Sequence, residues 1–308
     1  MPGVTEKNGQ SGLWVGLVLL ILLVGLSPFS GSKPVSASPD RLKWSIVDTP
    51  SREGNVVVSP SEINAFVIGS DDETFYAIDI PHSKIYTSTD GGVTWKDRLT
   101  EALVRDGANL PAWDIAVAPD DPDLVAVVSD NRTAVYASED GGDSWEDADV
   151  PDWALEQGLL ISGIALSPGY GDGERDIAVG TRCPDGNITG DVWARRMGIS
   201  GWKAQNLTID ITSIRFSFNY DEDKAILVIA STGNKDLDPS VQNRTFLCVG
   251  ERITNENRTW WYDSVEIIDP GENGSGDSPG RNEIIISDLA LRWEDYSEDA
   301  DWIAYAGY

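Results

Sequence analysis

The residues Ser88-Thr89-Asp90-Gly91-Gly92-Val93-Thr94-Trp95 recur fifty positions later as Ser138-Glu139-Asp140-Gly141-Gly142-Asp143-Ser144-Trp145. The residues around the two octads align at the same spacing of fifty without a gap. Residues 64–68 align with 114–118, and residues 84–86 align with 134–136. A fixed period near fifty residues is typical of repeat architectures. The sequence therefore predicts several packed copies of one small unit.

Each octad has the composition of a tight hairpin turn. The glycine pair allows positive φ without a Cβ clash, and the aspartate can accept backbone N–H bonds inside the turn. The tryptophan opens the returning strand and offers a large apolar face to pack beneath the turn. The residues predicted to build the two turns are Ser88, Asp90, Gly91, Gly92, Thr94 and Trp95, and Ser138, Asp140, Gly141, Gly142, Ser144 and Trp145.

The pattern S/T-x-D-G-G-x-S/T-W resembles the Asp-box, or BNR repeat, of β-propeller proteins. The resemblance implies an all-β propeller of four-stranded antiparallel blades, in which the box joins the third and fourth strands and has a structural role. Sialidases, xyloglucan hydrolases, sortilin-type receptors and photosystem assembly factors of the Ycf48/HCF136 type carry similar boxes. The box therefore indicates a fold and leaves several functions open.

We expect residues 1–37 to be a signal peptide or membrane anchor and 38–308 to be the propeller. The predicted blades cover about 63–98, 114–148, 162–204 and 212–262, with a partial repeat at 283–308. In the first two blades we expect strands at 63–68, 74–79, 84–88 and 93–98, and at 114–118, 124–129, 134–138 and 143–147. Residues 99–110 are expected to form a short helix or a loop.

The later repeats keep only part of the octad. The third turn, at 197–202, retains Trp202 but has no aspartate, and the fourth, at 254–260, retains Thr259-Trp260. Trp44-Ser45-Ile46-Val47 resembles the strand that follows each box. We therefore expect residues 44–47 to be the outer strand of a blade whose other strands come from the C-terminal part, unless the chain is part of a longer propeller.

The chain has 308 residues, enough for one domain of above-average size. It carries 23 basic and 51 acidic residues, a formal charge of −28. Such a charge repels nucleic acid and anionic lipid headgroups. It suits cations or basic partners, and simple solubility explains it equally well.

An unbroken apolar run extends from Leu13 to Leu26, preceded by a polar leader with Lys7. Fourteen residues are short for a membrane span and fit the hydrophobic part of a secretory signal. Val35-Ser36-Ala37 offers a small-residue cleavage site. We expect a secreted, periplasmic or cell-surface protein, cleaved or anchored by this segment, which is its only predicted contact with a membrane.

Two further residue types bear on an exported chain. Cys183 and Cys248 can pair as a disulfide, or remain separate thiols. Six asparagines begin N-x-S/T sequons and are glycosylation candidates in a host that glycosylates, and otherwise ordinary turn residues. They are Asn131, Asn187, Asn206, Asn243, Asn257 and Asn273.

The loops between first and second strands are acidic, as at 120–123, 172–176 and 219–223. Clustered carboxylates can bind calcium, but their spacing differs from a twelve-residue EF-hand loop, and turn chemistry explains them as well. The only histidine, His82, lies in a predicted surface loop. We therefore predict no metal centre and no cofactor.

No G-x-S-x-G elbow or phosphate-binding loop is found, and with 51 acids a chance carboxylate pair carries no weight. Near the first box only Arg41 and Arg52 stand where a sialidase-like arginine motif would be. We expect a non-catalytic binding or scaffold module that presents a propeller face to a protein or glycan partner. The alternative is a glycoside hydrolase fragment of sialidase or xyloglucanase type.

Overall fold

The computed structural model describes residues 62–151, 158–184, 188–232 and 244–266, together with the backbone of 288–291 and 304–307. The apolar run at 13–26, residues 44–47 and the predicted cleavage site lie outside these ranges. Within the described ranges, no helix is both long and apolar enough to cross a membrane.

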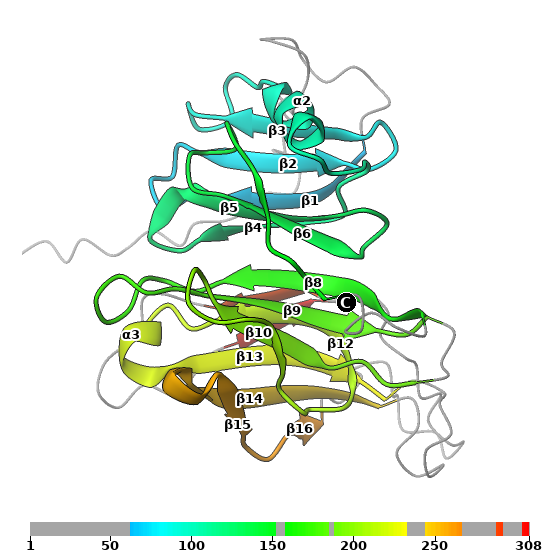
Figure 1. Ribbon diagram of the computed structural model, residues 1–308, viewed down its shortest axis with the longest axis vertical. Helices are drawn as coiled ribbons and strands as arrows, with labels where there is room; N and C mark the ends of the chain where they lie inside the picture. The colour runs from blue at the N-terminus through cyan, green and yellow to red at the C-terminus, as the bar shows by residue number, and fades with distance from the viewer. Residues whose placement is uncertain are drawn as a thin grey trace, which may run out of the picture. The chain divides into compact units, whose positions relative to one another are not determined.

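The described chain forms successive antiparallel sheets, which we call blades one to four (Figure 1). Blade one contains β1 (Ile63–Ile68), β2 (Phe75–Asp79) and β3 (Lys84–Ser88), and α2 (Arg98–Arg105) follows it. Blade two contains β4 (Asp114–Ala118), β5 (Asp121–Ser129), β6 (Ala134–Ser138) and β7 (Glu146–Asp147). Blade three contains β8 (Leu160–Leu166), β9 (Asp176–Arg182), β10 (Val192–Arg196) and β11 (Lys203–Ala204).

Blade four is a five-stranded sheet. Its elements are β12 (Asp210–Phe216), α3 (Tyr220–Asp223), β13 (Ala225–Ser231), β14 (Thr245–Ile253), η4 (Thr254–Glu256), β15 (Arg258–Trp261) and β16 (Val265–Glu266). A further hairpin pairs β17 (Asp288–Leu291) with β18 (Ala304–Gly307), and β17 lies against β12.

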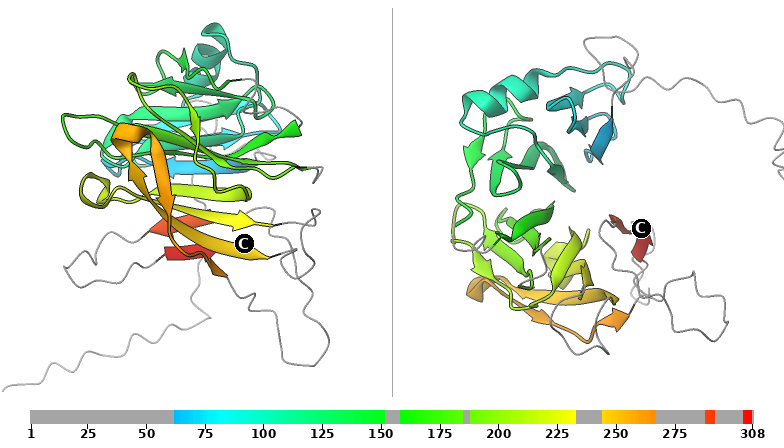
Figure 2. Two further views of the ribbon diagram at one scale, coloured as in Figure 1. Left: turned by 60° about the horizontal axis from the view of Figure 1, so that its bottom comes forward. Right: turned by 90° about the vertical axis from the view of Figure 1, so that its right-hand side faces the viewer.

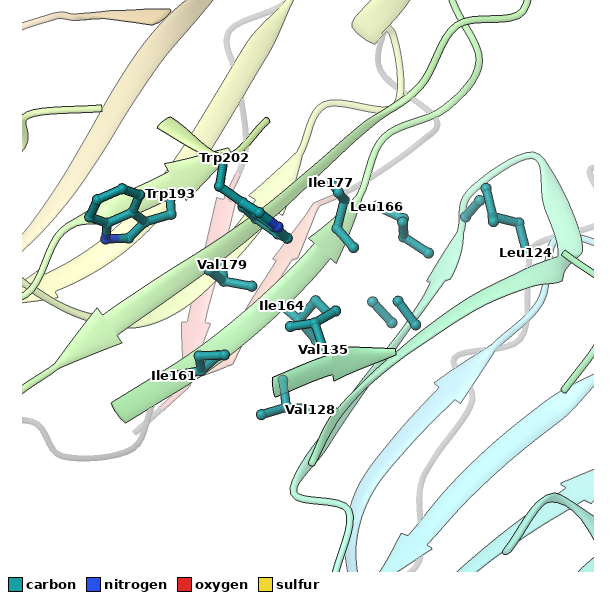
Figure 3. Close-up of a cluster of buried hydrophobic side chains, with 13 residues drawn as sticks. Leu124, Val128, Val135, Ile161, Ile164, Leu166, Ile177, Val179, Trp193 and Trp202 are labelled. Atoms are coloured by element: carbon teal, nitrogen blue, oxygen red, sulfur yellow. The ribbon is translucent and has the colours of Figure 1, made fainter. Parts of the chain in front are cut away.

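The core lies between blades. One cluster joins blades one and two, a second joins blades two and three, and a third joins blades three and four. Figure 3 shows the second cluster, in which Val128 and Val135 of blade two meet Ile161 and Ile164 of blade three. The blades follow one another in chain order (Figure 2), and each first strand contacts the first strand of the next blade. Such radial repetition of antiparallel sheets is a β-propeller.

Most expected strands are observed, but the outer strands of blades one and two are shorter than expected. The expected strand 93–98 reduces to one bridge between Thr87 and Lys96, and 143–147 reduces to β7. In blade one the chain leaves the sheet after this bridge because α2 begins at Arg98. The buried Leu99 and Leu103 of α2 pack into the core between blades one and two. Of the two alternatives expected for 99–110, a short helix or a loop, the structure shows a helix at Arg98–Arg105.

The alignment of 64–68 with 114–118 that the sequence suggested is wrong by one residue. Phe66 pairs with Ala77, and Ile115 pairs with Val127. Ala77 and Val127 occupy equivalent positions in the two blades. Ala77 pairs with Tyr86 and Val127 pairs with Tyr136, and each of these tyrosines stands two residues before the serine that begins its octad. Phe66 therefore corresponds to Ile115, and the turn after the first strand holds one more residue in blade two.

Candidate binding groove

The two octads form the same hydrogen-bonded turn. In the second turn the Ser138 hydroxyl donates to Asp140 Oδ1 (2.8 Å) and accepts the N–H of Gly142 (2.8 Å). Asp140 also accepts the backbone N–H of Ser144 (2.9 Å) and its hydroxyl (2.6 Å). Ser88, Asp90, Gly92 and Thr94 make the corresponding bonds within 0.1 Å of these lengths.

Both tryptophans of the octads are buried, with 4% of Trp95 and 4% of Trp145 exposed. Trp95 Nε1 donates to the carbonyl of Gly92 (2.9 Å), whereas Trp145 Nε1 has no partner among the described residues. Gly142 adopts φ of 88°, and a Cβ there would lie 2.1 Å from Leu99 of α2. A side chain at this position would therefore displace the Leu99 side chain as well as strain the turn.

The hydrogen bonds also set the charge of the turn. Those from the hydroxyl and backbone of Thr94 lower the pKa of Asp90 to about 2. The Ser144 hydroxyl, more than any other group, lowers the pKa of Asp140. Both carboxylates are therefore ionised near neutral pH, and the hydrogen bonds that they accept come from residues of their own turns.

The second octad borders a groove, which has a volume of about 930 Å³ between blades two and three. Its apolar floor includes Leu124 and Ile177, which also belong to the core shown in Figure 3. Ile199, with 62% of its surface exposed, stands on the blade-three side. Eight carboxylates line the groove: Asp121, Glu139, Asp140, Glu146, Asp147, Asp149, Asp172 and Glu174.

The two guanidinium groups of the groove are held by blade-to-blade contacts. Arg175 donates to both carboxylate oxygens of Asp120 (2.5 and 3.2 Å), and Arg195 donates to the carbonyl of Ala148 (2.6 Å). Burial raises the pKa of Asp120, but the bonds from Arg175 and the N–H of Gly169 more than offset this and lower it. The arginines thus join the blades, and the groove retains its negative charge.

The remaining predicted site residues lie elsewhere. Cys183 and Cys248 are buried thiols in neighbouring blades, and burial raises the pKa of Cys248 to about 12. His82 lies in the β2–β3 turn as expected, with Nδ1 2.8 Å from Asp79 Oδ1. No cluster of three or more potential metal ligands occurs in the described part of the chain.

Three of the sequon asparagines are described. Asn131 and Asn206 are exposed. Asn257 accepts from Arg252 (2.9 Å) and donates to the carbonyl of Gly201 (2.9 Å), so its side-chain amide is held by two internal bonds. The other three, Asn187, Asn243 and Asn273, lie outside the described residues.

The decayed octads behave differently in blades three and four. Trp202 is buried and donates to the carbonyl of Ala148 (2.7 Å), so it retains the packed role that the sequence indicates. In blade four the expected residue, Trp260, is 58% exposed. Its neighbour Trp261 packs on the core and donates to the carbonyl of Gln205 (3.0 Å). The expected register of the fourth turn is therefore wrong by one position.

A buried polar network that the sequence did not indicate joins blades three and four. Arg252 and Asp176, both with fully buried side chains, form an ion pair (3.2 Å). The hydroxyls of Tyr170 and Tyr220 also donate to Asp176 (3.0 and 2.6 Å), and Arg252 donates to Gln205 (2.8 Å). These partners are separated by up to 76 positions, and so no local motif marks them.

No family model and no curated protein matches this chain. Among solved structures, an ancestral GH74 enzyme aligns with 75% of this chain and 31% of its own, at 14% identity and a TM-score of 0.50. The Dos1 propeller aligns at 14% identity and 0.49, covering 71% of this chain and 51% of its own. YCF48 bound to D1 peptide aligns at 13% identity and 0.40, covering 68% and 57%. The chain thus spans less than two thirds of each, and at these identities the likeness supports the β-propeller fold alone.

Proposed function

We propose that this protein is an exported, non-catalytic Asp-box propeller that binds a basic segment of a protein partner in the groove between blades two and three. The observation that carries the proposal is the groove itself, where eight carboxylates surround an apolar floor. The matching hydrogen bonds of the two octads support the Asp-box assignment and its structural role. The apolar run at 13–26 supports export.

The chemistry of the partner follows from the carboxylates that the protein leaves unused. Glu139, Glu146 and Asp172 are exposed and make no hydrogen bond or ion pair with other described residues. A Lys- or Arg-bearing segment would pair with them at little desolvation cost, and an apolar side chain of the same segment would contact Leu124 and Ile199. The formal charge of −28 disfavours nucleic acid and anionic membranes as partners.

A hydrolase function has less support. A glycosidase needs an acid of raised pKa and a second carboxylate about 5–10 Å away across the bond it cleaves. Burial raises the pKa of Asp191 and of Asp223. However, Asp191 precedes β10 and Asp223 precedes β13, which places them at opposite ends of the strands. Both also accept backbone N–H bonds, Asp191 from Leu207 and Asp223 from Ala225.

The test is a calorimetric titration of the full chain with a synthetic Lys-rich peptide that has a central Leu. The groove variant carries Glu139→Gln, Glu146→Gln and Asp172→Asn. The control variant carries Glu62→Gln, Asp72→Asn and Glu101→Gln, which change the net charge equally at exposed positions outside the groove.

We expect the groove variant to weaken peptide binding by at least about tenfold and the control by less than about twofold, because close charge pairs dominate such contacts. Equal weakening in both variants would mean that binding follows net charge alone, and would reject the groove. Hydrolysis of xyloglucan or a sialoside by the full chain, abolished in the groove variant, would support the enzymatic alternative instead.

A further inference from the structure

The helix α2 lies between blade one and the turn of blade two. Its residues Leu99 and Leu103 are fully buried in the cluster that joins these blades. At its two ends, Arg98 forms an ion pair with Asp143 of the second octad, and Arg105 donates to the carbonyl of Asp143 (2.7 Å). Two leucines on one face and an arginine at each end therefore hold α2 against the second octad.

The third turn of the chain has the same place on blade three that the second octad has on blade two. Ser138 and Arg195 each lie on the third strand of their blade and pair with the second strand, opposite Val125 and Ile177. Each of them also stands seven positions before the buried tryptophan of its turn. The residues between can therefore be compared one by one.

The two turns differ in what covers them. Gly142 is buried, and a Cβ there would lie 2.1 Å from Leu99 of α2. Its equivalent in blade three, Ile199, is 62% exposed. The neighbouring Gly198 is also exposed, and a Cβ there would meet no described atom within 4 Å. Both Gly198 and Ile199 line the groove, so the groove lies where α2 covers the equivalent turn of blade two.

The blade-two wall of the groove agrees with this correspondence. The helix α2 begins at Arg98, three positions after Trp95. Ala148 and Asp149, which stand three and four positions after Trp145, line the groove. The groove therefore has, between blades two and three, the position that α2 has between blades one and two.

We propose that the groove receives the partner's basic segment as an amphipathic helix of about two turns, in the position that α2 occupies one blade earlier. This inference rests on the proposed function and specifies the conformation and residue pattern of the bound segment. The pattern is that of α2, with leucines four positions apart, which share one face of a helix, and a basic residue near each end. Eight residues of helix extend about 12 Å.

The side chains of the groove suit such a helix. The exposed carboxylates Glu139 and Glu146 stand on the blade-two side and Asp172 on the blade-three side, so basic residues at both ends of the helix find partners. The exposed Ile199 gives the leucines an apolar contact where Gly142 gives one to Leu99. Because so short a helix is marginal alone in water, the segment would gain helical structure as it binds.

The test compares two synthetic peptides of identical composition in titrations of the full chain. In the helix peptide the two leucines are four positions apart, with arginine one position before the first and two positions after the second, as in α2. In the strand peptide the same residues are reordered so that the leucines are two positions apart. Ile199→Ser is the groove variant for this test, and Val265→Ser, at an exposed position outside the groove, is its matched control.

We expect the helix peptide to bind at least about tenfold more tightly than the strand peptide and to gain helical circular dichroism on binding. Ile199→Ser should weaken the helix peptide by at least about fivefold, and Val265→Ser by less than about twofold.

Equal affinity for both peptides, lost on Glu139→Gln, Glu146→Gln and Asp172→Asn, would overturn the helix and leave the proposed function standing. A preference for the helix peptide that Ile199→Ser does not reduce would place the helix outside the groove and overturn the inference. If neither peptide binds, both the helix and the proposed function are rejected.

Discussion

At the scale of single residues, the hydroxyl groups and the aspartate of each octad bond to one another within the turn, and each octad buries one tryptophan. Asp140 accepts three bonds from Ser138 and Ser144, and Trp145 fills the space between blades one and two. The bonds of Asp140 and the burial of Trp145 therefore contribute to stability, and the acceptor bonds of Asp140 are made within its own turn. Its contribution can be measured separately for the tryptophan and for the aspartate.

Trp145→Ala should lower the free energy of unfolding by about 3 kcal/mol or more, because it deletes a buried aromatic side chain and leaves a cavity. Trp260→Ala is the matched control, since that indole is 58% exposed and should cost less than about 0.5 kcal/mol. Urea unfolding of both variants measures the difference. Equal losses would contradict the assignment of the packed tryptophans.

Asp140→Ala should cost about 1–2 kcal/mol near neutral pH through lost turn hydrogen bonds. The folded-state pKa of Asp140 lies below its unfolded value, so this contribution is present above about pH 4 and is lost as the pH falls through the folded pKa. Urea titrations of both proteins should therefore converge in acid. If the difference in the free energy of unfolding between the two proteins stays constant down to the lowest pH that allows refolding, the charge of the Asp140 carboxylate does not contribute to stability.

At the scale of elements, polar contacts between strands of neighbouring blades supplement the apolar clusters. The Arg252–Asp176 pair connects β14 to β9, and the carbonyl of Ala148 after β7 accepts from Arg195 and Trp202 of blade three. The buried pair is the more consequential contact, because removing one member leaves the other charge without compensation.

Arg252→Leu should destabilise the protein by about 3–5 kcal/mol, since Asp176 would remain buried with only tyrosine hydroxyls as side-chain donors. The control Arg258→Leu removes an exposed ion pair with Glu256 and should cost about 1 kcal/mol or less. Adding Asp176→Asn to Arg252→Leu should recover part of the loss. Thermal unfolding that is equally sensitive to both single changes would contradict the buried role of Arg252.

The sequence was sufficient to predict the repeat, most strands and the packed position of Trp202. It failed where one residue changes the register, as at Phe66 and at Trp260, because a shift of one position exchanges the two faces of a strand. The pairing of Trp261 with Gly250 across β14 and β15 determines which indole packs inward, and no local pattern encodes that pairing.

At the scale of the whole molecule, the groove arises only where two blades meet. Its carboxylates come from positions 121–174, and the sequence indicated the loops at 120–123 and 172–176 as acidic turns or calcium ligands and not as parts of one groove. Their convergence depends on contacts such as that of Arg175 with Asp120, 55 positions apart. The composition was enough to predict the excess of negative charge. It could not predict that eight of the carboxylates gather in one groove.

Binding of the Lys-rich peptide should weaken as salt is added, because the Debye length shrinks from about 10 Å at 0.1 M to about 3 Å at 1 M. The groove variant should show a shallower salt dependence than the wild type, and the control variant an unchanged one. Calorimetric titrations over a series of sodium chloride concentrations measure the slopes. Affinity that does not respond to salt would exclude charge pairing as the basis of binding.

The most direct test of the proposed function is hydrogen–deuterium exchange of the full chain with and without the Lys-rich peptide. We expect slower exchange at 138–149, 172–177 and 195–199, which border the groove from blades two and three, and unchanged exchange at 62–96. Protection confined to blade one or to blade four, or no protection at saturating peptide, would contradict it.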